Sequence, residues 1–93
     1  MLFRSFIAVA LERCYNNGDV EELGTIVPIF EVVDLSAADN DDRVKHVATL
    51  QSPQSLSPEG LLFVHDTKNS GHMFVTNEVS QTLDTYSINI TDL

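Results

Sequence analysis

The chain has 93 residues, a formal net charge of −9 and 43% hydrophobic residues, so we expect one small folded unit of marginal stability unless neighbours add to its core. Five basic residues against fourteen acidic ones oppose binding to nucleic acid, which depends on Lys and Arg neutralising phosphates. The lone Cys14 excludes an internal disulfide and a Cys-rich zinc site, and no apolar run is long enough to cross a bilayer.

The first third of the chain predicts two strands joined by a long loop. Residues Phe6–Leu11 (FIAVAL) form a short apolar run that is typical of a strand. A signal peptide led by Arg4 is the competing interpretation, but the Glu-Arg pair that follows the run interrupts its apolar core. The second predicted strand is Ile26–Leu35, and Pro28 inside it indicates an edge strand, a bulge or the beginning of a strand.

After an acidic connection at residues 36–43, the middle of the chain predicts a third strand and a loop. Val44–Leu50 alternates partly between apolar and polar residues, which favours an outer strand, with a helix as the competing interpretation. The stretch 51–60 is rich in Ser and Pro and is predicted to be loop. It ends in Ser57-Pro58-Glu59-Gly60, an order that suits a type I turn.

The last third predicts three short strands. They are Leu61–Val64, Met73–Thr76 and Leu83–Ile88, and residues 65–71 form a hairpin-type loop between the first two. No segment of the chain shows sustained helical periodicity. The sequence therefore predicts an all-β fold.

An internal repeat relates the beginning of the chain to its end. The matched positions are Ile7 with Met73, Val9 with Val75, Glu12 with Glu78, and residues 30–32 with residues 86–88. Strand pairs that recur with a polar turn are typical of β-propeller blades. We therefore predict a partial β-propeller of about one and a half to two blades, in which 1–50 and 61–93 are blade-like units and 51–60 is the linker.

Four segments, in this order along nearly the whole chain, resemble one known family. They are LER at 11–13, VVDLS at 32–36, SPEGL at 57–61 and FVTNEVSQT at 74–82. The family is that of the choice-of-anchor I propellers, which includes mesenchyme-specific cell-surface glycoproteins linked to biomineralisation and proteins labelled atypical alkaline phosphatases. The resemblance implies a seven-bladed propeller of the YVTN type, similar to WD40 propellers, and a secreted or surface-anchored location. It also implies that the chain is a C-terminal fragment of a longer protein.

One turn departs from the pattern of this family. Where the family usually has NEVSGT, this chain has Ser80-Gln81-Thr82, so the Gly that would take a positive φ at little cost is missing. A looser turn is expected here. Ser80 is assigned to this turn, and Ser57, Pro58 and Gly60 to the earlier one.

Three glutamates at strand-to-turn junctions are the candidate metal ligands. Glu12, Glu59 and Glu78 would gather on one face of a propeller, where Ca²⁺ finds six to eight oxygen ligands, with Asn77 adding a carbonyl oxygen. The alternative is structural, because the carboxylates can also accept backbone N–H groups or pair with Arg13 between blades. Calcium is the one cofactor considered, and no catalytic residue is predicted.

The other acidic and histidine residues of the sequence do not match a known metal-binding pattern, and one sequon is present. The acidic residues of loop 36–43 lack the Gly and ligand positions of an EF-hand, and the histidines have no metal-binding spacing; these residues are Asp39, Asp41, Asp42, His46, His65 and His72. The histidines are interpreted as surface or half-buried strand residues. Asn89 begins an Asn-Ile-Thr sequon for N-glycosylation, which agrees with a secreted glycoprotein.

The function expected from these features is non-catalytic. It is a structural or binding role within a secreted or cell-surface propeller, with calcium as the candidate ion. The alternatives are a fragment of a metal-dependent phosphoesterase and a truncated gene product without independent function. The expected partners are the remaining blades, or another copy that pairs with exposed strand edges.

Overall fold

The computed structural model describes residues 4–11, 24–53 and 57–93. It consists of two three-stranded antiparallel sheets, which confirms the all-β prediction. The first sheet has the order β1-β2-β3, with β1 at Ser5–Ala8, β2 at Thr25–Val32 and β3 at Val44–Ser52. The second has the order β4-β5-β6, with β4 at Pro58–Thr67, β5 at Ser70–Asn77 and β6 at Thr82–Asn89.

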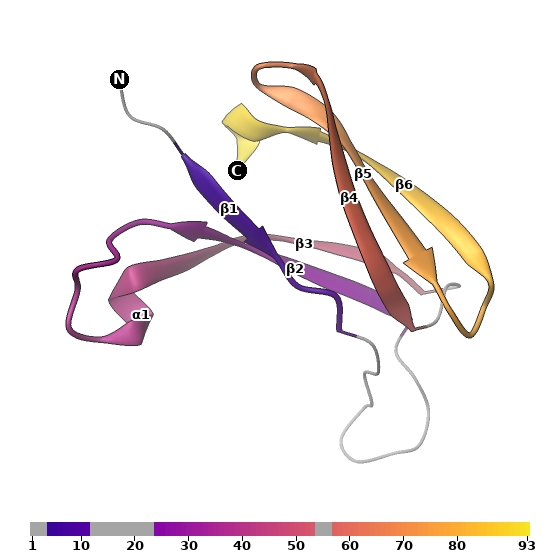
Figure 1. The fold of residues 1–93 in the computed structure, drawn as a ribbon, viewed down its shortest axis with the longest axis horizontal. Helices are drawn as coiled ribbons and strands as arrows, with labels where there is room; N and C mark the ends of the chain where they lie inside the picture. Colours follow the sequence, from indigo (N-terminus) through magenta and orange to yellow (C-terminus); the bar gives the residue numbers. More distant parts are fainter. Residues whose placement is uncertain (1–3, 12–23, 54–56) are drawn as a thin grey trace.

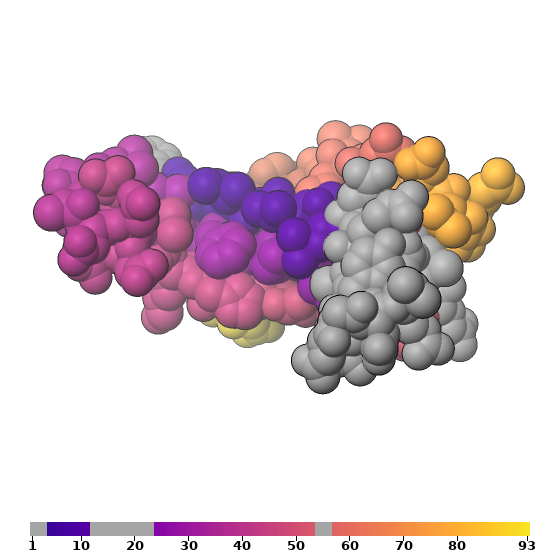
Figure 2. Space-filling model, turned by 90° about the horizontal axis from the view of Figure 1, so that it is seen from below, coloured from indigo at the N-terminus to yellow at the C-terminus, as the bar shows by residue number. Residues whose placement is uncertain are grey.

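Two short helices complete the described part of the chain. Helix α1 spans Asn40–Arg43 in the acidic connection that was predicted to be loop, and the 3-10 helix η1 spans Ile90–Asp92 after the last strand. The two sheets cross at an angle and meet where β3 leads into β4 (Figure 1). The molecule is elongated, 43 × 34 × 18 Å, with the connection between β2 and β3 projecting at one end (Figure 2).

The core lies between the two central strands and β6. Alternate residues of β2 and β5 are buried, because successive side chains of a strand point to opposite faces of its sheet. The buried apolar side chains are Val27, Ile29, Met73, Val75 and Ile88. This core is small for a chain of this length, so we expect the packing of the two inner faces to give the fold only marginal stability.

The two hairpins of the predicted repeat have equivalent registers. Ile7 lies opposite Phe30 in the first sheet, and Met73 lies opposite Tyr86 in the second. The matched residues nevertheless differ in their surroundings, because Ile7 is exposed on the edge strand β1 whereas Met73 is buried in the central strand β5.

Pro28 lies in the middle of the central strand β2, which the rule for proline in sheets did not anticipate. Its carbonyl oxygen accepts a hydrogen bond from the N–H of Val9, just beyond the end of β1. Because the N–H and C=O of one strand residue point to the same neighbour, the missing N–H falls on the β1 side, between the end of β1 and the isolated bridge of Leu11 with Ile26. The pairing between β2 and β3 loses no donor.

Several strand boundaries differ from the predictions. Strand β2 ends at Val32 instead of Leu35, and the hairpin between β4 and β5 turns over Lys68 and Asn69 alone, so most of the predicted loop 65–71 is strand. The predicted loop 51–60 contributes its first two residues to β3 and its last three to β4. The third strand itself is confirmed over the competing helix.

The expected type I turn at Ser57-Pro58-Glu59-Gly60 does not form. Ser57 has a φ of +61°, and Pro58 opens β4 opposite Asn77. The carbonyl oxygen of Ser57 accepts a 2.8 Å hydrogen bond from the N–H of Glu78. These residues become part of the sheet because they pair with the end of β5. This pairing joins residues about 20 positions apart, so the turn preferences of residues 57–60 do not predict it.

Gln81 takes a backbone conformation that glycine adopts at little cost. Its φ is +54°, and it ends the loop between β5 and β6 immediately before Thr82. The hydroxyls of Ser80 and Thr82 lie 2.8 Å apart in a hydrogen bond across this loop. A non-glycine residue therefore occupies a left-handed conformation in this turn, at a cost in backbone strain.

Candidate functional site

A polar junction joins the two sheets where β2 begins and β5 ends. Thr25 and Asn77 are buried there, and the Thr25 hydroxyl donates a hydrogen bond to Oδ1 of Asn77. The amide nitrogen of Asn77 donates to Oδ2 of Asp84 at 3.0 Å and to the hydroxyl of Thr82 at 3.2 Å. Both ends of the Asn77 amide are thus occupied by protein groups, one from each sheet.

Two further polar side chains of the second sheet and its beginning are shielded from water: Ser57, next to the partner of Asn77, is buried, and Tyr86 on β6 is half-buried. Ser57 is 2% exposed and its hydroxyl has no hydrogen-bond partner within the described part of the chain. Burial raises the pKa of the Tyr86 phenol, and the charge of Asp84 raises it further, while the Ser52 hydroxyl partly offsets both effects. The phenol therefore stays neutral across the physiological range.

The predicted metal ligands are only partly brought together. Asn77 and Glu78 follow each other at the end of β5, and Glu59 lies one residue from Pro58, the partner of Asn77. Both glutamates are exposed, whereas the Asn77 oxygen is already bonded to Thr25. Glu12 lies outside the described residues. The calcium site stays a prediction.

The other residues singled out from the sequence have clear positions. The three histidines lie in strands, as predicted. His46 contacts Thr49 and the ring of Phe30 on the neighbouring strand, His65 contacts the ring of Phe63, and His72 lies 3.0 Å from Asp66. Asn89 is exposed at the end of β6, and its side-chain oxygen accepts hydrogen bonds from the N–H and hydroxyl of Thr91. Glycosylation of Asn89 stays a prediction.

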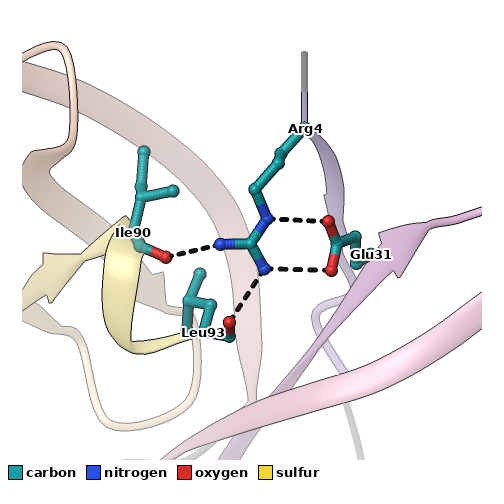
Figure 3. Close-up of polar contacts among 4 residues, drawn as sticks. All are labelled: Arg4, Glu31, Ile90 and Leu93. Atoms are coloured by element: carbon teal, nitrogen blue, oxygen red, sulfur yellow. Dashed lines mark hydrogen bonds and ion pairs between the residues drawn. The ribbon is translucent and has the colours of Figure 1, made fainter. Parts of the chain in front are cut away.

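A second polar connection between the sheets centres on Arg4, which the sequence did not single out as a contact residue (Figure 3). Its guanidinium donates two hydrogen bonds to the carboxylate of Glu31, at 2.7 and 2.9 Å. It also donates to the main-chain oxygens of Ile90 and Leu93 at 2.9 and 2.8 Å. One side chain therefore ties the first sheet to the last turn of the described chain.

No local pattern in the sequence could have revealed this contact. Arg4 is 27 residues from Glu31 and 86 from Ile90. The only available signal was the strand pairing itself, since Phe6 lies opposite Glu31 and Arg4 precedes Phe6 by two residues, immediately before β1. The ring of Phe6 supports the guanidinium, whose carbon lies 4.8 Å from the ring centroid.

The Arg4 contact makes stability depend on pH. Its hydrogen bonds are the main cause that lowers the pKa of Glu31, and the charges of Arg4 and Lys45 act in the same direction. A carboxyl whose pKa is lowered by folding stabilises the fold above its ordinary pKa, and this contribution is lost as the pH falls through the lowered value.

We expect Glu31→Gln to be less stable than the parent chain at pH 7 and to approach it as the pH falls below 4. Urea denaturation at a series of pH values measures this difference. Glu78→Gln removes the same formal charge elsewhere and is the control for the net charge of −9. A difference between Glu31→Gln and the parent that does not change with pH would contradict the assignment.

Comparison of the chain with protein-family models, curated proteins and solved structures gives no match.

Proposed function

We propose that the chain is a non-catalytic segment of a larger secreted or cell-surface β-propeller, where it serves a structural or binding role. The observation that carries this proposal is that both sheets bear apolar side chains on their outer faces as well as on the faces that form the core. An antiparallel sheet with one face in water normally alternates between apolar and polar residues. Sheets that are apolar on both faces are typical of stacked blades.

The outer face of the second sheet is the clearer case. Leu62, Val64 and Leu83 are 62%, 44% and 59% exposed. Leu62 lies opposite Phe74 in the neighbouring strand, so the apolar side chains continue from β4 into β5. We call Leu62, Val64, Phe74 and Leu83 the outer patch.

The first sheet repeats this feature. Phe6 and Ala8 pack against the core, so the residue between them, Ile7, points to the opposite face and is 46% exposed. Its neighbour across the strands is Phe30. A further sheet on each side would bury these residues, as adjacent blades do in a propeller.

The exposed faces and edges give a testable consequence for the isolated chain. We expect it to self-associate as its concentration rises, and we expect the double variant Leu62→Thr, Val64→Thr to shift it toward the monomer. Each exposed side chain of this kind contributes about 1 kcal/mol or more when it is buried in a contact. Sedimentation velocity over a range of concentrations measures the change.

The control is the double variant Val33→Thr, Leu35→Thr. It makes the same kind of change at two exposed residues, 53% and 76% accessible, in the connection that follows β2. Self-association that falls equally in both double variants would show that the outer patch has no special role. A parent chain that stays monomeric at high concentration would count against the proposal itself.

Calcium binding is part of this proposal, with Glu59 and Glu78 as its ligands in the described chain. Both carboxylates are exposed near the end of β5. We expect calorimetric titration with Ca²⁺ to give heat that decreases in Glu78→Gln, because carboxylates are the preferred ligands of this ion. Equal heats for the parent and the variant would remove Glu78 from the proposal. The extracellular location and the modification of Asn89 belong to the same proposal.

A further inference from the structure

A cleft opens between the two sheets at the end that carries Arg4. Its volume is about 520 Å³, within the range of about 300–1,000 Å³ that is usual for small-molecule sites. The first sheet lines it with Phe6, Ala8 and Ile29, and the second lines it with Phe63, Met73 and Ile88. The walls are thus apolar and partly aromatic, and they come from both sheets.

The charges around this cleft are opposite to those of the chain as a whole. The chain has fourteen acidic residues and five basic ones, yet no acidic side chain lines the cleft among the described residues. Two of the five basic side chains, Arg4 and Lys68, do line it. This distribution favours a ligand with a negative charge.

Lys68 is the basic group that remains available. Arg4 already donates to the Glu31 carboxylate and to two main-chain oxygens. Lys68 lies in the two-residue turn between β4 and β5, and it makes no hydrogen bond or ion pair with the residues described here. The neighbouring Asn69 is held by its carbonyl oxygen, which accepts a 2.7 Å hydrogen bond from the N–H of Ile90. The ammonium group thus stands on a fixed turn at the rim of an apolar cleft.

We infer that this cleft binds a small amphipathic anion, a medium-chain alkyl or aryl carboxylate whose apolar body lies between the sheets and whose carboxylate pairs with Lys68. The inference is independent of the proposed function, because it rests on the inner faces of the sheets and not on the outer patch. A neutral apolar molecule of the same size would gain the burial of its body but not the ion pair.

Octanoate and its neutral counterpart 1-octanol are the probes that test this inference. In protein labelled with ¹³C at the methionine methyl groups, the Met73 signal reports directly on the cleft, and Met73→Leu identifies that signal. We expect octanoate to shift it, and Lys68→Gln to weaken octanoate binding about two- to fivefold, as the loss of a partly exposed ion pair does. Binding of 1-octanol should not change in this variant.

Lys45→Gln is the matched control, because it removes the same charge from β3, away from the cleft. We expect it to leave octanoate binding unchanged. Three results would each overturn the inference: a Met73 signal that octanoate does not shift, equal weakening by Lys68→Gln and Lys45→Gln, or 1-octanol binding as tightly as octanoate to the parent chain.

Discussion

Replacing Asn77 with alanine is expected to destabilise the chain by about 1–3 kcal/mol, the cost of leaving buried polar partners unsatisfied. Asn77 is 3% exposed and bridges Thr25 of the first sheet to Asp84 and Thr82 of the second. Its removal takes the acceptor from the Thr25 hydroxyl and one hydrogen bond from the Asp84 carboxylate. Urea denaturation at pH 7 measures the loss.

Asn40→Ala is the matched control for this variant. Asn40 is exposed in α1, where its side-chain oxygen makes only a long contact of 3.4 Å with Arg43 among the described residues. We expect its replacement to change the stability by about 0.5 kcal/mol or less. Measuring the loss of stability in Asn77→Ala with and without calcium separates the two roles of Asn77, as a structural residue and as a metal ligand. A structural role predicts the full loss in the absence of calcium, and a loss that appears only with calcium present would identify Asn77 as a ligand.

The second large effect is expected from Gly71→Ala. A Cβ at this position would overlap the carbonyl oxygen of Val64 and lie 2.6 Å from the ring carbon Cζ of Phe63. The Val64 oxygen belongs to the backbone of β4, just before the register shift between His65 and Thr67, so it cannot turn aside as a side chain can. We expect a loss at the upper end of the usual overpacking range of about 1–3 kcal/mol.

Gly60→Ala provides the contrast. Its Cβ would also be crowded, at 2.5 Å from the hydroxyl oxygen of Thr76, but this atom ends an exposed side chain that can rotate away. Rotation costs only the 2.9 Å hydrogen bond that this hydroxyl accepts from the N–H of residue 60. Both substitutions reduce the entropy of the unfolded chain equally, so the difference between them isolates the backbone clash. We expect the midpoint of thermal denaturation to be clearly lower for Gly71→Ala than for Gly60→Ala. Equal midpoints would mean that β4 adjusts to the new methyl group.

The prediction of six strands succeeded because each strand is a short apolar run bounded by polar residues, which is local information. The strand pairs predicted from the repeat do form, with Ile7 opposite Phe30 and Met73 opposite Tyr86, although the first pair is separated by a longer connection. The site residues fared less well. The role of Asn77 as a ligand stays a prediction, and its hydrogen bond to Thr25, 52 positions away, could not be read from local patterns.

The sequence by itself determined the all-β class and the approximate positions of the six strands along the chain, because alternation and turn residues act over a few positions. Only the tertiary structure decided that Pro28 sits in a central strand, that Pro58–Gly60 joins β4 and that Gln81 takes a positive φ. Each of these depends on where a distant strand lies. The same holds for the contact of Arg4 with Glu31 and for the cleft, which exist only once the two sheets pack together.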